Sequence, residues 1–200
     1  LHKNPVEKRV AHSADLILAT SQFILKKFYD TRARKLKLNH GLAAHFMSYA
    51  GKKLELDNKA RPIAGMLGNL MIHLLNRGLL LKLVKRYDKV DFWFVGPNGL
   101  SNLSRTDRYM YFIDQLREQS NCYLIGEVAS EEIPRYLRLF DINLVCYDIQ
   151  GNYEQLANPH KMMEYLSAGK VTLATPTAEY ENLGLIHMAD GEAYLEKFGQ

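Results

Sequence analysis

Long apolar runs and cysteines are both scarce in this sequence of 200 residues. No apolar stretch approaches the roughly 20 residues that a bilayer-spanning helix needs, and no secretory signal opens the chain. The two cysteines, Cys122 and Cys146, lie in apolar segments where a small buried thiol packs well. They predict free core cysteines in a reducing compartment, and we therefore expect a cytoplasmic protein.

The sequence also lacks a strong charge of one sign. Lys and Arg total 26 against 22 Asp and Glu, the net charge is +4, and the basic residues are spread along the chain. This distribution argues against nucleic-acid binding. We interpret the one basic stretch, residues 31–37, as a solvated loop; contact with phosphate or an anionic membrane surface is the alternative.

An initiator methionine is absent, since the chain begins at Leu1, and we expect a piece of a longer protein. Residues 14–20 predict a strand, and a helix follows to about residue 29 with Ser21 as its N-cap. Residues 35–39 predict a second strand. The polar segment 50–61 has no apolar period, which divides the chain into residues 1–50 and 51–200.

Beyond residue 61 the pattern alternates between strands and helices. Strands are predicted at 62–68, 90–96, 122–126, 142–147, 170–176 and 185–188; helices are predicted at 70–86, at 105–119, after an N-cap at Ser130, at 160–168 and from 192. This alternation predicts an α/β fold, a Rossmann-like parallel sheet with helices on both faces. Ligands of such sheets bind at the carboxyl ends of strands, here the turns after Leu67, Val95, Ile125 and Tyr147.

The segment from Gly65 to Asn69 is the first candidate at such an end. Glycines between a strand and a helix let backbone N–H groups approach an anion, and a diphosphate would fit there. The alternative is that these glycines only make a tight turn, because the segment is not the Gly-x-Gly-x-x-Gly pattern of dinucleotide-binding proteins.

Residues 158–176 form the richer candidate. Pro159 suits a first helical turn, so Lys161 is expected near a helix N-terminus, where donors favour an anion. Glu164 projects from the same face, and its carboxylate can accept both hydroxyls of a ribose. The alternative interpretation is a surface ion pair between Lys161 and Glu164, which spacing alone would favour.

Several motifs follow one another in a characteristic order: residues 14–21, 39–46, 63–69, 94–97, 124–128, 132–136 and 140–147, and Asn-Pro-x-Lys-x-x-Glu-Tyr-Leu-x-Ala-Gly-Lys at 158–170. In this order the chain resembles the GT-B glycosyltransferases. More specifically, it is similar to the large retaining family, called family 4 or group 1, that makes bacterial capsule, lipopolysaccharide and other surface glycans. Residues 1–50 resemble the end of the acceptor-side domain, and residues 51–200 resemble a donor-binding domain that is truncated at its C-terminus.

The resemblance implies roles for eight donor-binding residues. It places Gly68 and Asn69 near the diphosphate or sugar, Lys161 at the phosphate and Glu164 at the ribose. It places Glu127 and Val128 beside the base, and Asn158 and Pro159 in the motif that leads into the helix.

Two features depart from the family pattern. The first of the family's two glutamates is replaced by Leu156, for which Glu154 or Asn158 is a candidate substitute. The family's arginine beyond the glycine loop has only Arg77 as a candidate remnant, and a helix-surface arginine is the alternative. The catalytic residues therefore stay unassigned.

The implied reaction is transfer of a sugar from a nucleotide diphosphate donor, such as a UDP- or GDP-sugar, with retention and without a metal or other cofactor. The implied acceptor is a glycan or lipid-linked glycan bound through the missing domain, at the inner face of the membrane, so that these residues alone bind donor without turnover. No Asp-x-Asp occurs, and His40, His45 and His160 lack the grouping of metal ligands. Two alternatives stay open: a GT-B nucleotide-sugar epimerase, and a non-catalytic module that binds a nucleotide or a partner.

Overall fold

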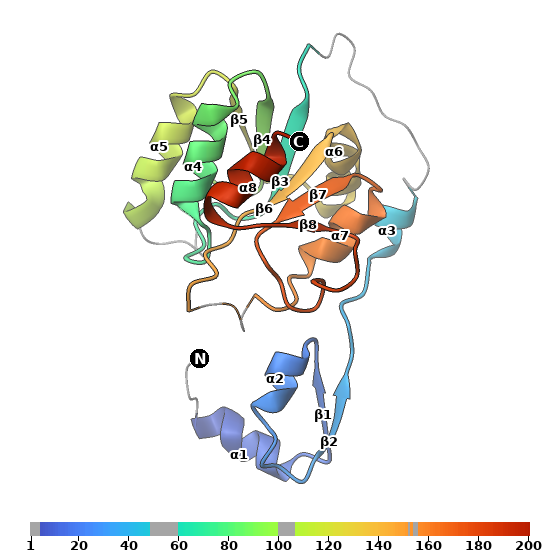
Figure 1. The fold of residues 1–200 in the computed structure, drawn as a ribbon. Helices are drawn as coiled ribbons and strands as arrows, with labels where there is room; N and C mark the ends of the chain where they lie inside the picture. Colours follow the sequence, from blue (N-terminus) through green and yellow to red (C-terminus); the bar gives the residue numbers. More distant parts are fainter. Residues whose placement is uncertain (1–4, 49–59, 100–106, 152, 154–155) are drawn as a thin grey trace.

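The computed structural model describes residues 5–48, 60–99, 107–151, 153 and 156–200, which form a small N-terminal unit and a larger unit (Figure 1). The small unit comprises α1 (Pro5–Ser13), β1 (Leu16–Ala19), α2 (Gln22–Lys26) and β2 (Arg34–Lys37). The two strands run parallel, with Leu18 opposite Leu36. Ser21 caps α2 as predicted, because its side chain accepts a hydrogen bond from the amide of Ile24 at 3.2 Å.

The larger unit is built on a sheet of six parallel strands in the order β5-β4-β3-β6-β7-β8. The strands are β3 (Ile63–Leu67), β4 (Asp91–Val95), β5 (Cys122–Gly126), β6 (Ile142–Val145), β7 (Val171–Ala174) and β8 (His187–Met188). The strand order reverses between β3 and β6, which is the topological switch point of a Rossmann-like sheet, where such folds bind ligands. The predicted fold class is confirmed.

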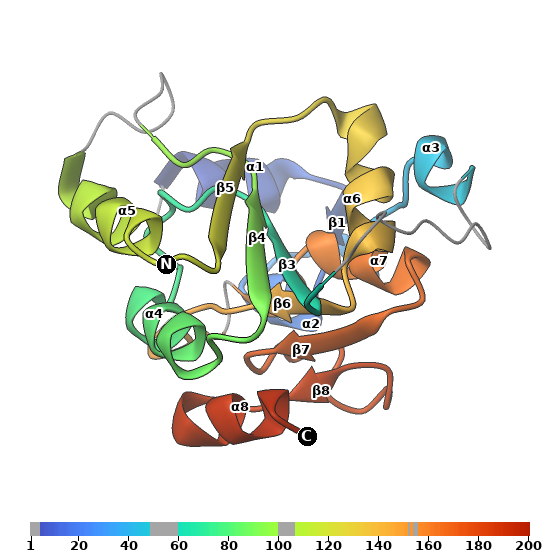
Figure 2. The same ribbon diagram turned by 90° about the horizontal axis from the view of Figure 1, so that it is seen from above.

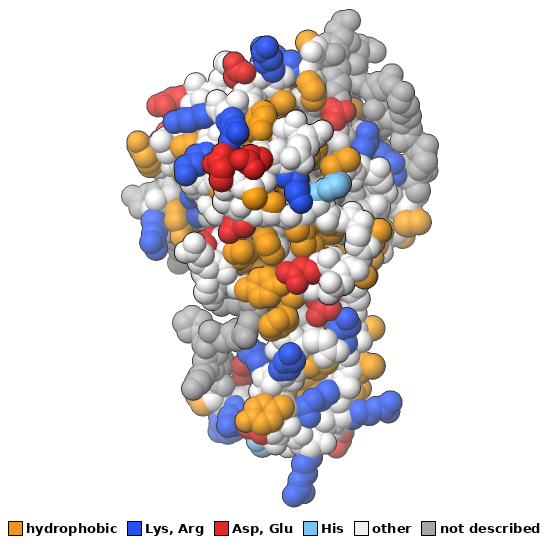
Figure 3. Space-filling model, viewed as in Figure 1, with side chains coloured by type: hydrophobic (Ala, Val, Ile, Leu, Met, Phe, Trp, Pro, Cys, Tyr) orange, Lys and Arg blue, Asp and Glu red, His pale blue; other side chains and the backbone are white. Residues whose placement is uncertain are grey.

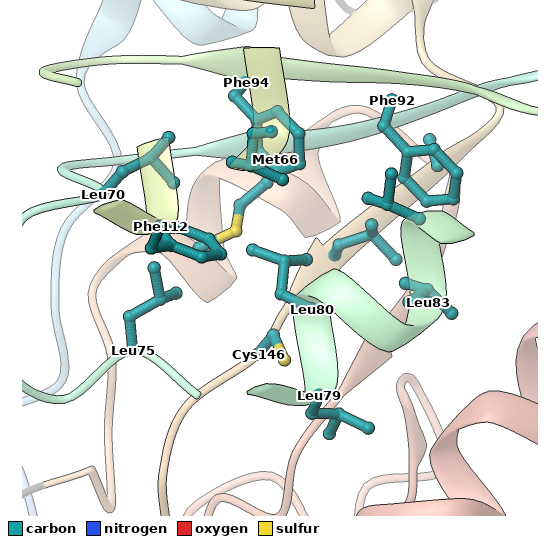
Figure 4. Close-up of a cluster of buried hydrophobic side chains, with 14 of the residues drawn as sticks. Met66, Leu70, Leu75, Leu79, Leu80, Leu83, Phe92, Phe94, Phe112 and Cys146 are labelled. Carbon is teal, nitrogen blue, oxygen red and sulfur yellow. The ribbon is translucent and has the colours of Figure 1, made fainter. Parts of the chain in front are cut away.

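Helices cover both faces of the sheet (Figure 2). On one face lie α4 (Arg77–Arg86), α5 (Met110–Arg117) and α8 (Gly191–Phe198); on the other lie α3 (Ala44–Met47), α6 (Ile133–Leu139) and α7 (Lys161–Ser167); the 3-10 turns η1 (Asp107–Tyr109) and η2 (Ser130–Glu132) precede α5 and α6. Each face buries its own apolar cluster. Figure 4 shows the first, in which Phe92 and Phe94 of β4 meet Leu80 and Leu83 of α4.

The prediction of a helix over residues 70–86 is wrong in its first part, because α4 begins at Arg77. The backbone before it bonds elsewhere: the amide of Leu70 donates to the carbonyl of Pro97, and the amide of Asn76 donates to the carbonyl of Cys146. The Asn76 side chain then caps the helix by accepting from the amide of Leu79 at 3.1 Å.

Two further local predictions are corrected. Ser130 does not cap a helix, because its hydroxyl bonds to the Glu131 carboxylate and α6 begins only after η2. Gly65 is not part of a turn but lies within β3, where a Cβ would stand 2.0 Å from the Phe140 ring, so this glycine makes room for core packing. The predicted boundary at residues 50 and 51 lies outside the described residues.

Candidate donor site at the switch point

Helix α7 is fixed to the switch point by a buried tyrosine. The Tyr165 hydroxyl accepts a hydrogen bond from the amide of Leu67 at 2.8 Å and donates to the carbonyl of Leu144 at 3.2 Å. The first partner ends β3 and the second lies in β6, so one side chain joins the two central strands. Burial raises the pKa of this hydroxyl, which stays protonated and keeps its donor.

The Lys161 side chain lies across the glycine that follows β3. Gly68 has φ of +131°, a conformation that side-chain-bearing residues rarely adopt, and a Cβ there would stand 2.8 Å from Lys161 Cε and 3.0 Å from its Nζ. Burial lowers the pKa of the lysine, and the nearby Glu164 carboxylate acts in the opposite direction. A half-buried ammonium therefore faces the backbone at the end of the central strand.

Glu164 is half-buried on α7, in the turn of helix after Lys161. Burial raises the pKa of its carboxyl, while Lys161 and His45 act to lower it. Burial raises the pKa of Tyr147 to about 12, and the negative charge of Glu164 adds to this effect. Among the described residues no ion pair joins Lys161 to Glu164, so the surface ion pair that spacing favoured is not what the structure contains. Both groups keep capacity for a ligand.

Asn158 faces the small unit. Its side-chain nitrogen donates to the carbonyl of Thr20 at 2.6 Å and to Asn39 Oδ1 at 2.7 Å, and the His40 ring lies 3.1 Å from its carbonyl. The segment that leads through Pro159 into α7 is thus held by the N-terminal unit. Its Oδ1, the acceptor atom that could stand in for a carboxylate oxygen, is buried and has no hydrogen-bond partner among the described residues, so Asn158 stays a candidate substitute.

The other candidate substitute, Glu154, lies outside the described residues. Leu156, at the position of the missing glutamate, is 4% exposed and packs in the core cluster on the α6 and α7 face.

The remaining predicted donor residues lie along the same edge of the sheet. Asn69 follows Gly68, and its Oδ1 accepts a hydrogen bond from the amide of Met71 at 2.7 Å, which shapes its own loop. Glu127 is exposed after β5, and Val128 packs against the core cluster. The structure thus brings Gly68, Lys161 and Glu164 together, while Glu127 and Val128 follow a strand two positions away.

The Arg77 guanidinium is engaged by the loop before α4 and by an aromatic ring. It donates to the carbonyls of Leu70 at 2.9 Å and Ile72 at 2.5 Å and stacks 3.4 Å from the centre of the Tyr109 ring. Burial lowers its pKa, with opposing influence from Tyr109. This arginine holds the loop before α4 in place.

Sequence reasoning did not assign Tyr165 or Tyr147 to this site. Tyr165 lies inside the motif at 158–170, but the sequence alone does not show whether its hydroxyl forms structural hydrogen bonds or its ring only packs in the core. In the described part of the chain, no group of three or more His, Cys, Asp or Glu residues is placed to hold a metal ion. No helix in that part is long and apolar enough to cross a membrane.

The strand order and the groups at the switch point define an α/β protein with a candidate ligand site at the carboxyl ends of its central strands. No family model matches the chain. It is 26% identical over 176 residues to TuaH of Bacillus subtilis (strain 168), which is named as a teichuronic acid biosynthesis glycosyltransferase; the match covers 84% of this chain and 42% of TuaH. The chain therefore spans less than half the length of this relative.

Solved structures show the same fold. HepE of Anabaena, crystallised with UDP and glucose, matches 99% of this chain with a TM-score of 0.69 at 14% identity, over 57% of its own chain. A glycosyltransferase of Rickettsia africae ESF-5 matches 100% of this chain with a TM-score of 0.70 at 15% identity, again over 57% of its own length. The chain thus resembles GT-B glycosyltransferases, and its six-stranded unit has the fold of their Rossmann-like domains.

Proposed function

We propose that the chain binds the nucleoside diphosphate of a nucleotide-sugar donor and forms the donor-side part of a glycosyltransferase. One observation carries this proposal. A half-buried ammonium, Lys161, lies against the Gly68 backbone at the switch point, and a half-buried carboxylate, Glu164, lies in the next turn of the same helix. The first suits a phosphate, and the second suits the hydroxyls of a ribose.

The proposed reaction is transfer with retention at the anomeric carbon and without a metal ion. Negative charge grows on the leaving diphosphate in the transition state, and Lys161 stabilises it electrostatically from a fixed, partly desolvated position. Glu164 orients the nucleoside by accepting hydrogen bonds from its ribose. Because the HepE structure contains UDP, a UDP-sugar is the first donor to test.

For the whole protein we propose a glycan or lipid-linked glycan acceptor, bound through an acceptor-side domain, in bacterial surface polysaccharide synthesis. The naming of TuaH for teichuronic acid biosynthesis supports this setting. A place in the cytoplasm at the inner face of the membrane is part of the proposal, and Lys and Arg side chains gather over the small unit in Figure 3. These 200 residues alone are proposed to bind donor without turnover.

The test of binding uses Lys161→Ala and Glu164→Ala, with Lys85→Ala on the exposed surface of α4 as the matched control. Both site variants should weaken UDP binding at least tenfold and leave the melting temperature without ligand nearly unchanged, whereas Lys85→Ala should bind like wild type. Equal affinity in all four proteins would reject the site.

The test of reaction class uses a protein that also carries an acceptor-side domain. Release of UDP from a UDP-sugar that depends on an added glycan acceptor is the result expected of a transferase. Conversion of the sugar without acceptor would indicate an epimerase, and nucleotide binding with neither reaction would indicate a non-catalytic module. Either of these two results would contradict the proposal.

A further inference from the structure

The short helix α3, which precedes the six-stranded sheet in the sequence, places a residue on the Glu164 side of the candidate donor site. This helix, Ala44–Met47, packs against α6 and α7 (Figure 2). It is anchored by Phe46, which is 4% exposed and belongs to the same core cluster as Met162 and Tyr165 of α7. The neighbouring residue on this anchored helix is His45.

The His45 imidazole is shielded and unsatisfied. Its Nε2 atom is buried and has no hydrogen-bond partner among the described residues. A polar atom buried in this way destabilises the fold unless a ligand or water supplies its hydrogen bond. An unfilled donor position of this kind beside a proposed binding site indicates a group that the ligand supplies.

Two carboxylates, on α7 and η2, interact electrostatically with this imidazole. On α7 the Glu164 carboxyl has its pKa raised by burial and lowered in part by Lys161 and His45. On η2 the pKa of Glu131 is lowered first by a backbone hydrogen bond, then by Ser130, and to a smaller extent by His45. Among the described residues neither carboxylate makes a direct hydrogen bond or ion pair with His45. Because α3 packs against α7 and no direct bond joins the two side chains, the imidazole and the Glu164 carboxylate both keep capacity for a shared ligand.

We propose that His45 and Glu164 bind the same ribose hydroxyl of the donor nucleotide, an inference that rests on the proposed function. A hydroxyl has one hydrogen and two lone pairs. The Glu164 carboxylate accepts its hydrogen, and His45 Nε2 donates to its oxygen. This arrangement satisfies the buried nitrogen and gives the carboxylate a partner at the same time.

Glu131 is the less suitable partner for His45. It is exposed and already accepts a hydrogen bond from Ser130 at 3.2 Å, whereas Glu164 is half-buried beside Lys161. In this arrangement the ribose lies between α3, which precedes the six-stranded sheet in the sequence, and α7, whose Lys161 is proposed to bind the phosphate. The site therefore selects ribonucleotides over nucleotides that lack the ribose hydroxyls.

The experiment combines variants with ligands in calorimetric titrations of the 200-residue chain. The ligands are UDP and 2′,3′-dideoxy-UDP, and the variants are His45→Ala, His45→Gln and Glu164→Gln. His187→Ala, an exposed histidine on β8, and Glu131→Gln are the controls. Thermal unfolding without ligand is measured for each protein, and His45→Gln keeps most of the side-chain volume if His45→Ala is unstable.

The expected result is coupling between residue and hydroxyl. His45→Ala should weaken UDP binding about tenfold and dideoxy-UDP binding less than twofold, with partial rescue in His45→Gln because its amide can donate. Both controls should bind like wild type. Equal losses for the two ligands, no loss for either, or a Glu131→Gln effect as large as that of His45→Ala would each overturn the inference and leave the proposed function standing. If wild type binds neither nucleotide, the proposed function falls and this inference with it.

Discussion

Replacing Gly68 with alanine perturbs the proposed phosphate site in a way that the structure makes quantitative. The added methyl group would stand 2.8 Å from Lys161 Cε and 3.0 Å from its Nζ, at a backbone φ of +131°. The backbone conformation costs about 1–3 kcal/mol for a residue with a side chain. Since Cε and Nζ end a flexible side chain, the ammonium moves away rather than breaking the fold.

The displaced ammonium should lower the affinity for UDP in addition to the cost of the backbone conformation in stability. A hydrogen bond from a charged group contributes about 1.5–3 kcal/mol, and each 1.4 kcal/mol is about tenfold in affinity. We therefore expect Gly68→Ala to weaken UDP binding about 10- to 100-fold. Gly184→Ala is the matched control, because Gly184 also has a positive φ, +64°, but no atom within 4 Å of an added Cβ.

The assay is UDP titration together with thermal unfolding of Gly68→Ala, Gly184→Ala, Lys161→Ala and the double variant Gly68→Ala/Lys161→Ala. If Gly68 acts through Lys161, the double variant should bind UDP no more weakly than Lys161→Ala. Unchanged UDP affinity in Gly68→Ala would contradict a role for the Lys161 contact with Gly68 in binding. So would a further tenfold loss in the double variant, since it would show that the glycine acts independently of the lysine.

Three further predictions concern stability and reactivity. Tyr165→Phe leaves the buried amide of Leu67 without its partner and should cost about 2 kcal/mol, which is about 4–8 °C in melting temperature; an unchanged melting temperature would show that the link across the switch point is unimportant. Burial raises the pKa of Glu179, but the hydrogen bonds from Lys37 and from the Gln22 amide outweigh this effect and the pKa is lowered. Glu179 contributes about 1 kcal/mol to docking of the small unit, a small value because Lys37 is partly exposed. This stabilisation is present above the pKa of Glu179 in the unfolded chain and is lost as the pH falls through its pKa in the folded protein. The protection of residues 16–26 from hydrogen exchange, relative to the intrinsic rate at each pH, should therefore fall in Glu179→Gln at pH 7 and in wild type on acidification; identical protection in variant and wild type at pH 7 would contradict this. Burial raises the pKa of Cys122, which is half-buried, to about 12, and also raises that of the fully buried Cys146. Ellman's reagent at pH 8 should therefore label both thiols far more slowly in the folded protein than in urea, and rapid labelling of both in the folded protein would contradict this.

The sheet could be predicted because its strands are short apolar runs bounded by turn residues. Ile63–Leu67 is buried at every position, as a central parallel strand must be, and that continuous apolar pattern is visible in the sequence. The predicted Ser21 cap also appears in the structure, since a side-chain cap depends only on nearby residues.

Elements that depend on distant contacts could not be predicted. Leucines at helical spacing suggested a helix from residue 70, but the amide of Leu70 bonds to the distant Pro97 carbonyl instead. Gly65 looked like part of a phosphate turn, whereas its small size is required by the ring of Phe140. The four-residue helix α3 has no periodicity of its own, so His45 gave no signal as a site residue.

The site could be predicted only in part for the same reason. The spacing of Lys161 and Glu164 predicted that both lie on one face of a helix, because helical spacing depends only on nearby residues. The contact between Lys161 and Gly68 arises because Tyr165 fixes α7 across the ends of β3 and β6, which no pattern of residues reveals. The roles of Asn69, Glu127 and Val128 in donor binding stay predictions.

A nucleoside diphosphate site at the switch point can be tested by calorimetric titration of the chain with UDP, GDP and ADP, each with magnesium and with a chelator. We expect saturable binding of one of the three nucleotides, with an affinity that the chelator leaves unchanged and that Lys161→Ala lowers at least tenfold. Absence of binding by all three, or binding that Lys161→Ala leaves unchanged, would contradict a nucleoside diphosphate site at the switch point.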